Sequence, residues 1–189
     1  VDRGATLRLG WEVTESRRRA GCWVLRLRDP RSGAIGTVEA RAVVNAAGPW
    51  AAEVAARLHA PGDGRHAAPP RLKHVQGSHI VVPRLYQGAH ACILQHPDRR
   101  VVFLIPYEHH YTLIGTTDVD VGERYADPRP DAAEIAYLCQ VASGYAARPV
   151  TPDEVVWSFS GVRALVDDRR EDPSAVTRDY RLEVEASAE

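Results

Sequence analysis

The chain has 189 residues, of which 44% are hydrophobic and 26% charged, and its formal net charge is −1. This composition is typical of one globular domain or slightly more. No stretch reaches the roughly 20 apolar residues that a membrane-spanning helix needs, and no signature of a nucleic-acid-binding module occurs, so we expect neither a transmembrane segment nor a nucleic-acid partner. The histidines and the three cysteines show no metal-ligand spacing, so we expect no metal site.

The charges are unevenly distributed along the sequence. Residues 1–95 carry 14 basic and 7 acidic side chains, whereas residues 96–189 carry 10 basic and 18 acidic ones. The basic excess would suit a phosphate or an anionic lipid as partner. A solvated charged face is the simpler interpretation.

Alternating apolar residues organise the first third of the chain. They predict strands within residues 5–28, with a turn at 17–21, and a further short strand at about 35–40. The run Ala-Val-Val-Asn-Ala at residues 42–46 is typical of a strand that is buried on both faces. Pro49 suits the first turn of a helix, and apolar residues at helical spacing predict that helix over about 50–58.

Residues 60–71 contain three prolines and two glycines, which predict a loop and the best candidate for a domain boundary. Asp131 suits the start of a helix over residues 131–146. We expect six strands after the loop, at about 72–83, 91–95, 101–106, 111–117, 154–163 and 176–185. The pattern therefore predicts an α+β fold, a mostly antiparallel sheet with few helices, divided into residues 1–60, a linker at 61–71 and residues 72–189.

Arg163 lies in an otherwise apolar, strand-like stretch. A guanidinium is rarely buried without an anionic partner, and its planar fork of donors suits a carboxylate or a phosphate. On a strand, Gly161 and Arg163 share one face, and the glycine leaves room for a ligand. Arg163 is thus a candidate anion-binding residue; an ion pair with Asp167 or Asp168 at the end of the strand is the alternative.

Four uncommon segments follow one another in the sequence. They are Asn-Ala-Ala-Gly-Pro-Trp at 45–50, Gly-Ser-His at 77–79, Ile-Gly-Thr-Thr-Asp at 114–118, and Ser-Gly-Val-Arg at 160–163 with Thr-Arg-Asp-Tyr at 177–180. In this order they resemble the aerobic, FAD-dependent glycerol-3-phosphate dehydrogenase family over about residues 40–185.

That family begins with a G-x-G-x-x-G dinucleotide-binding motif, which this sequence lacks. Met is also absent throughout. The resemblance therefore implies an internal fragment: part of an FAD-binding domain in residues 1–60, and a substrate-binding domain like that of D-amino-acid oxidase in residues 72–189.

The resemblance also implies which residues form the site. It makes Arg163 and Arg178 substrate-binding residues, and two guanidiniums can hold a phosphate dianion. It places His79 in the active site, where the imidazole could take the hydroxyl proton of the substrate. Deprotonation by water, or a His79 that is merely polar and near the sheet surface, are the alternatives. Thr117 is implied as a further substrate contact, although the run Thr116-Thr117-Asp118 could simply cap a turn.

The turn at residues 45–50 is the candidate cofactor contact. Small side chains before a helix let backbone N–H groups approach a phosphate or a ribityl chain. The resemblance implies flavin contacts through Ala47, Gly48 and Trp50. The family more often has Thr at position 47, so a hydroxyl contact is not expected there, and ordinary tight-turn chemistry explains the same pattern.

The expected function is that of a flavoenzyme that oxidises sn-glycerol 3-phosphate to dihydroxyacetone phosphate and passes electrons through FAD to quinone. We expect this fragment alone to be inactive and to lack tightly held FAD. An amine or amino-acid oxidase of the same flavin superfamily, in which the arginine binds a carboxylate, and a non-catalytic anion-binding module are the alternatives. The family further implies a cytoplasmic protein, peripheral at the membrane, that could form oligomers.

Overall fold

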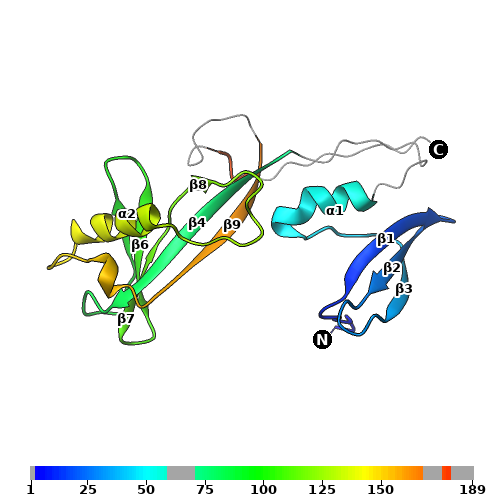
Figure 1. Cartoon of the computed structure of the whole chain (residues 1–189), viewed down its shortest axis with the longest axis horizontal. Helices are drawn as coiled ribbons and strands as arrows, with labels where there is room; N and C mark the ends of the chain where they lie inside the picture. Colours follow the sequence, from blue (N-terminus) through cyan, green and yellow to red (C-terminus); the bar gives the residue numbers. More distant parts are fainter. Residues whose placement is uncertain (1–2, 59–70, 168–175, 180–189) are drawn as a thin grey trace. The chain divides into compact units, whose positions relative to one another are not determined.

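The computed structural model describes residues 3–58, 71–167 and 176–179 (Figure 1). The described residues divide into two compact units, the first within residues 1–70 and the second within residues 71–181. Each unit has its own sheet, and strand pairing within both sheets is antiparallel. The predicted fold class, mostly antiparallel with few helices, is confirmed.

The first unit is a three-stranded meander followed by a helix. Its strands β1 (Glu12–Arg19), β2 (Cys22–Arg28) and β3 (Ile35–Ala40) pair in sequence order. β1 and β2 are joined by a two-residue turn whose residues, Ala20 and Gly21, both have positive φ, as a tight hairpin requires. The short 3-10 helix η1 (Gly48–Trp50) leads into α1 (Ala51–Leu58), as the position of Pro49 predicted.

The prediction of a buried strand at residues 42–46 is wrong. This segment is irregular, and Val44 is 88% exposed. A strand buried on both faces needs a hydrogen-bonded neighbour on each edge and a layer on each face. Among the described residues, no strand pairs with this segment, because the meander ends at Ala40. The apolar run alone did not reveal that dependence on neighbours.

The second unit is a six-stranded sheet built around the long strand β4 (Leu72–Pro83). β9 (Trp157–Val166) pairs with β4 over ten residues, from Leu72 opposite Val166 to Val81 opposite Trp157. The other pairings give the order β5-β6-β7-β4-β8. The remaining strands are β5 (Cys92–Gln95), β6 (Val101–Tyr107), β7 (Tyr111–Gly115) and β8 (Val119–Asp120).

Most of the strands expected in this unit are confirmed within a few residues. The structure differs from the expected set of strands at two places. The two-residue strand β8 was not predicted, and it pairs with β4 through Asp120 opposite Val75. The strand expected at residues 176–185 falls largely outside the described residues, and its described part, residues 176–179, is irregular.

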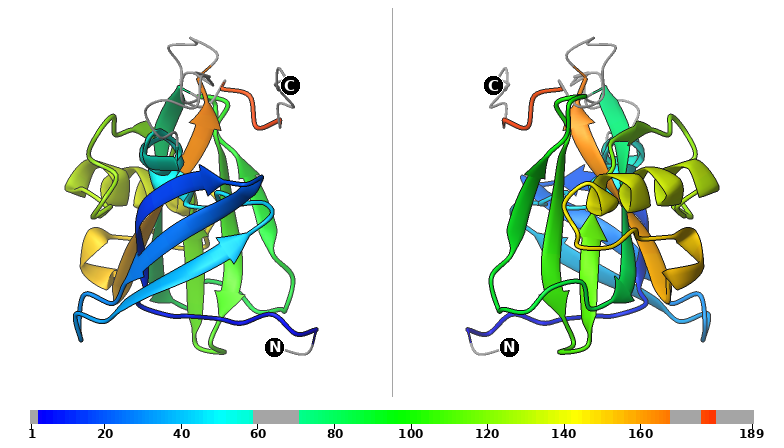
Figure 2. Two further views of the ribbon diagram at one scale, coloured as in Figure 1. Left: turned by 90° about the vertical axis from the view of Figure 1, so that its right-hand side faces the viewer. Right: turned by 90° about the vertical axis from the view of Figure 1, so that its left-hand side faces the viewer.

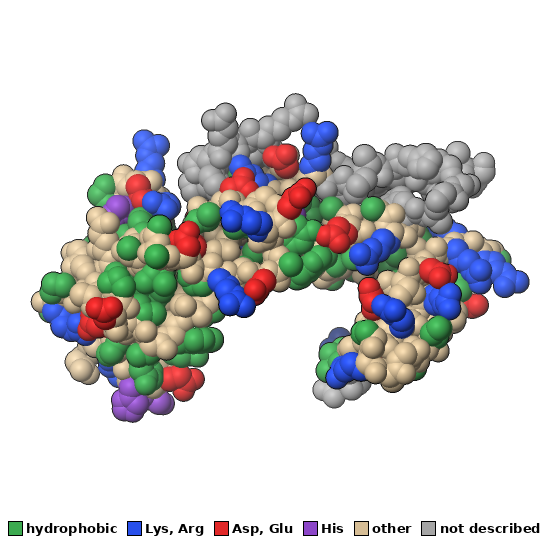
Figure 3. Space-filling view, in the orientation of Figure 1, with side chains coloured by type: hydrophobic (Ala, Val, Ile, Leu, Met, Phe, Trp, Pro, Cys, Tyr) green, Lys and Arg blue, Asp and Glu red, His purple; other side chains and the backbone are tan. Residues whose placement is uncertain are grey.

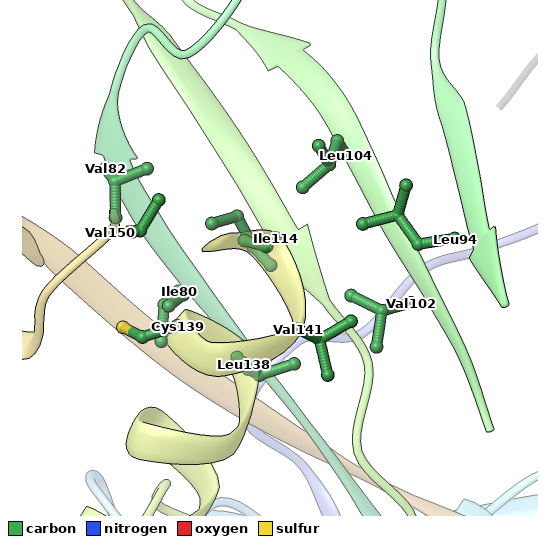
Figure 4. Packing of buried hydrophobic residues seen from close by; sticks show 11 residues of the cluster. Ile80, Val82, Leu94, Val102, Leu104, Ile114, Leu138, Cys139, Val141 and Val150 are labelled. Atoms are coloured by element: carbon green, nitrogen blue, oxygen red, sulfur yellow. The ribbon is translucent and has the colours of Figure 1, made fainter. Parts of the chain in front are cut away.

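One face of this sheet packs against α2 (Ala132–Ser143), and the core lies between the two. The right-hand view of Figure 2 shows α2 in front of the strands. Leu138 and Val141 of α2 are buried against alternate residues of the sheet. Figure 4 shows this cluster, whose sheet members are Ile80, Val82, Leu94, Val102, Leu104 and Ile114.

The start of α2 is a capping box, close to where the sequence predicted the helix. The Asp131 carboxylate accepts from the Glu134 backbone N–H at 2.8 Å, and the Glu134 carboxylate accepts from the Asp131 N–H at 3.1 Å. Both groups satisfy backbone donors that the helix leaves unpaired at its first turn.

We expect Asp131→Ala to lower the free energy of unfolding by about 1 kcal/mol, because the Glu134 N–H loses its acceptor. Chemical unfolding of the full-length protein measures this. Asp153→Ala, in the exposed 3-10 helix η2 (Pro152–Glu154), is the matched control. Equal unfolding midpoints for the two variants would contradict the capping role.

Basic and acidic side chains lie side by side on the visible face of each unit (Figure 3). In the first unit, Arg26 pairs with Glu15 at 3.0 Å, and Arg28 pairs with Glu12 at 3.3 Å, all largely exposed. These ion pairs favour the simpler interpretation, a solvated charged surface, over a basic patch. No helix among the described residues is both long and apolar enough to cross a membrane.

Candidate functional site

The pairing of β4 with β9 brings the two candidate site residues onto one face of the sheet. Gly77 lies opposite Gly161, His79 opposite Phe159, and Val75 opposite Arg163. Directly opposed residues of antiparallel strands point to the same side. His79 and Arg163 therefore share the face that is turned away from α2, since Ile80 and Val82 of β4 point into the core.

The guanidinium of Arg163 is held by an acidic residue in the short segment between β7 and β8. Its Nη1 donates to Asp118 Oδ1 at 2.9 Å, and its Nη2 reaches Thr116 Oγ1 at 3.5 Å. Arg178 Nη2 lies 3.4 Å from the same Asp118 oxygen. The Asp118 side chain is 13% exposed, against 34% for Arg163 and 53% for Arg178. The cluster joins both predicted arginines through the Asp118 carboxylate, and its arginine side is the more exposed one.

Asp118 was not predicted to pair with Arg163. The alternative considered from the sequence was Asp167 or Asp168, of which Asp168 lies outside the described residues. The signal in the sequence is the polar run Thr116-Thr117-Asp118 at the end of a predicted strand, but this run by itself indicates only a turn cap or a substrate contact.

Glycine at position 77 leaves room for the close approach of the guanidinium. A Cβ atom on Gly77 would lie 2.9 Å from Arg163 Nη2 and 3.0 Å from Nη1, and closer still to Thr116 Oγ1. At Gly161, directly across the strand pair, a Cβ would meet no heavy atom within 4 Å. Gly77 makes room for the arginine, and Gly161 leaves open space beside it, as the sequence predicted for a ligand approach.

His79 is partly enclosed beside this cluster. Its ring stacks on Phe159 with centroids 4.9 Å apart and planes 5° from parallel. Gly115, opposite it on β7, leaves the space that the imidazole occupies, because a Cβ there would overlap the ring. The His79 Nδ1 atom is buried and has no hydrogen-bond partner among the described residues.

Burial lowers the pKa of His79 below the ordinary imidazole value, and the nearby Arg163 charge lowers it further. The imidazole is therefore neutral at physiological pH and able to accept a proton. Its unpaired buried nitrogen and its position beside a guanidinium are typical of a site that handles a polar ligand.

Thr117 lies on the other side of the sheet from this group. It is 1% exposed, and its hydroxyl donates to Glu134 Oε1 at 2.6 Å while accepting from the Ser78 N–H at 2.9 Å. Both hydrogen-bonding functions are thus used inside the protein. The expected substrate contact by Thr117 does not fit this arrangement, because its neighbours Thr116 and Asp118 are the residues that reach Arg163.

The candidate cofactor segment belongs to the first unit, where Asn45 organises the turn. Its Nδ2 donates to the Ala51 carbonyl at 2.7 Å, and its Oδ1 accepts from the Ala47 N–H at 3.2 Å. Gly48 has φ +55°, a conformation that favours glycine, and a Cβ there would meet nothing within 4 Å. Trp50 is 43% exposed.

The residues of this turn fit part of what a flavin needs. The backbone at Gly48 is open to a close approach, and Trp50 offers exposed ring surface. The N–H of Ala47 is engaged by Asn45 and that of Trp50 by the Ala47 carbonyl, so this turn offers a flavin the open side of Gly48 and the exposed ring surface of Trp50. No group of three or more metal-ligating side chains occurs within the part of the chain that the structure describes.

The chain is similar to known proteins over nearly its whole length. The chain is 40% identical over 185 residues to glycerol-3-phosphate dehydrogenase of Pseudomonas aeruginosa and 39% identical over 185 residues to D-erythritol 1-phosphate dehydrogenase of Brucella abortus. It is 37% identical over 188 residues to aerobic glycerol-3-phosphate dehydrogenase of Escherichia coli. These matches cover 97–98% of this chain but only 35–36% of each relative, so the chain spans about a third of their length.

A solved structure has the same fold. Glycerol-3-phosphate dehydrogenase from Bacillus halodurans, complexed with FAD, superposes with a TM-score of 0.69 at 28% identity, covering 84% of this chain and 32% of that one. The model of the family DAO, FAD dependent oxidoreductase, matches residues 1–180. The chain therefore belongs to the family of FAD-dependent oxidoreductases.

Proposed function

We propose that the full-length protein oxidises sn-glycerol 3-phosphate to dihydroxyacetone phosphate with FAD as the electron acceptor, and that this chain supplies its substrate-binding sheet. The observation that carries the proposal is the placement of Arg163 and His79 on one sheet face, with Arg178 joined to Arg163 through Asp118. The names of the relatives from Pseudomonas aeruginosa and Escherichia coli support the choice of substrate.

The arginine cluster provides the recognition of the phosphate. Arg163 presents a planar fork of donors, and Arg178 lies within reach of the same carboxylate. Asp118 lies within ion-pair distance of both guanidiniums and holds them next to each other. Two charge-assisted pairs on a phosphate dianion are shorter and roughly twice as strong as neutral hydrogen bonds.

His79 provides the proton acceptor in this proposal. Oxidation of the secondary alcohol requires the hydroxyl proton to leave as hydride leaves the carbon. An imidazole is a common proton acceptor, and the lowered pKa of His79, caused by burial and by Arg163, keeps the ring neutral and ready to accept at physiological pH. FAD, when bound, supplies the hydride acceptor, and Gly48 and Trp50 are the residues of this chain that would contact it.

A second candidate substrate is supported by the relative from Brucella abortus. That protein is named for D-erythritol 1-phosphate, which combines a phosphate with a secondary alcohol. The same arginines and histidine would serve both substrates.

Anaerobic reduction of the flavin in the full-length protein, measured with each compound in turn, distinguishes the two substrates. Reduction by sarcosine or glycine instead would favour an amine oxidase. We expect the highest kcat/KM with glycerol 3-phosphate.

We further propose that the electrons pass from FAD to quinone, in a cytoplasmic protein that lies peripherally at the membrane and could form oligomers. The word aerobic in the name of the Escherichia coli relative supports a respiratory acceptor. Reduction of a quinone analogue faster than of oxygen, by the full-length protein added to membrane vesicles, is the expected result. Oxygen as the faster acceptor would contradict this proposal.

Gly77→Ala tests whether the room left by Gly77 sets the position of the Arg163 guanidinium. The new methyl group overlaps Thr116 Oγ1 and crowds the Arg163 guanidinium, so we expect kcat/KM for glycerol 3-phosphate to fall about 100-fold, the usual effect of misplacing a binding group by about 1 Å. Steady-state kinetics of the full-length enzyme provide the measurement.

Gly161→Ala adds a methyl group on the same sheet face and controls for the effect of that methyl group on stability. It meets no protein atom within 4 Å, so its unfolding midpoint should stay near that of the wild type while that of Gly77→Ala falls. A Gly77→Ala enzyme with unchanged kinetics would show that the position of Arg163 does not matter for activity.

A further inference from the structure

Glu134 makes more contacts than the capping of α2 requires. It is 6% exposed, and its Oε2 accepts both the Asp131 N–H and the Gln76 side-chain amide, the latter at 2.9 Å. Its Oε1 accepts two hydroxyls at 2.6 Å each, from Ser78 and from Thr117. A buried carboxylate is costly unless it is well hydrogen-bonded, and a capping box alone uses only the backbone contact. The additional contacts therefore need another explanation.

The two hydroxyls belong to segments that carry the candidate site. Ser78 lies between Gly77 and His79 on β4, and Thr117 lies between Thr116 and Asp118. Ser78 and Thr117 are also joined directly by the hydrogen bond from the Ser78 N–H to Thr117 Oγ1.

The connection extends to β9. Ser78 Oγ lies 2.7 Å from Ser160 Oγ, and Ser160 precedes Arg163 by three residues on that strand. One carboxylate on α2 is thus linked to the three segments that bear His79, Asp118 and Arg163.

In extended chain, neighbouring residues point to opposite faces. Fixing Ser78 of β4 on the α2 side therefore fixes the direction of His79 on the opposite side. Fixing Thr117 likewise anchors the irregular segment whose next residue, Asp118, bonds to Arg163. The hydrogen bonds to Glu134 are short and charge-assisted, which makes them well suited to hold these directions.

We propose that Glu134, acting through the Thr117 and Ser78 hydroxyls, is a positioning residue that holds Asp118 and Arg163 in the geometry needed to bind the phosphate of the substrate. This inference rests on the proposed function and assigns the residues behind the binding face. It also gives Thr117 a role that its buried hydroxyl permits.

The test compares Thr117→Val, Thr117→Ser and Ser143→Ala in the full-length enzyme. Valine keeps the shape of threonine but removes the bonds to Glu134 and to the Ser78 N–H. Ser143 is the matched control. Like that of Thr117, its hydroxyl donates to a residue of α2, the Cys139 carbonyl, and accepts from a backbone N–H, that of Val150, but it lies away from the candidate site.

We expect Thr117→Val to raise KM for glycerol 3-phosphate about 10- to 100-fold with a smaller change in kcat. Thr117→Ser should restore most of this loss, and Ser143→Ala should lower the unfolding midpoint without changing KM.

A double-mutant comparison with Arg163→Lys shows whether the effect passes through the arginine. If it does, Thr117→Val should change KM less than about threefold in the Arg163→Lys background, because coupled residues are not additive. Two outcomes would overturn the positioning role: effects of Thr117→Val and Arg163→Lys on KM that are fully additive, or a KM for Thr117→Val equal to that of Ser143→Ala. A wild-type enzyme that does not oxidise glycerol 3-phosphate would instead overturn the proposed function, so the two failures are distinguishable.

Discussion

Arg163→Lys in the full-length enzyme is expected to lower kcat/KM for glycerol 3-phosphate by about 100-fold. Lysine keeps the charge but loses the planar fork that reaches Asp118 and Thr116 together. Disrupting one member of a buried, hydrogen-bonded charge pair costs about 2–5 kcal/mol, and the partial exposure of Arg163 puts the expected effect in the lower half of that range. Each 1.4 kcal/mol corresponds to about a tenfold change. Steady-state kinetics with glycerol 3-phosphate provide the measurement.

Arg100→Lys is the matched control for this substitution. Arg100 pairs with Asp98 at 2.7 Å and lies over the Tyr137 ring of α2, so it is an Arg–Asp pair of similar exposure on the other side of the sheet. We expect its kcat/KM to remain near that of the wild type. Equal losses in the two variants would mean that Arg163 acts only through folding.

His79→Asn is expected to lower kcat by about 100- to 10,000-fold, the range for loss of a general base. KM should change little, since the arginines bind the phosphate. His109→Asn is the matched control, because His109 is exposed and has φ +60°, which asparagine tolerates. A His79→Asn enzyme that keeps wild-type kcat would assign the deprotonation to water.

The pH dependence of His79 follows from its lowered pKa. Activity that requires neutral His79 rises with pH through the folded-state pKa, which lies below the ordinary value of about 6.5, and is level above it. His79→Asn should abolish this rise. The unfolded chain binds more protons here than the folded one, so the contribution of His79 to stability is complete above about pH 6.5 and is lost as pH falls toward the folded-state pKa.

Much of the sheet could be predicted because the signals are local. The period-two patterns of β4 and β9 gave both strands and the shared faces of Gly77 with His79 and of Gly161 with Arg163. Asp131 before an apolar stripe likewise gave the start of α2.

What could not be predicted depends on pairing between distant segments. The neighbours of Arg163 are set by the β4–β9 register and by Asp118, 45 residues earlier in the sequence. The side to which Thr117 points depends on Glu134, whose buried carboxylate no local pattern distinguishes from a surface glutamate. The strand wrongly expected at residues 42–46 failed for a related reason, since an apolar run does not specify the neighbours that would pair with it.

A structure of the full-length protein with glycerol 3-phosphate bound would test the assignment of the β4–β9 face most directly. We expect phosphate oxygens within about 2.7–3.2 Å of the Arg163 guanidinium, and the substrate hydroxyl within the same range of a His79 ring nitrogen. A ligand bound on the α2 side of the sheet, or one that leaves both side chains without contact, would contradict the assignment.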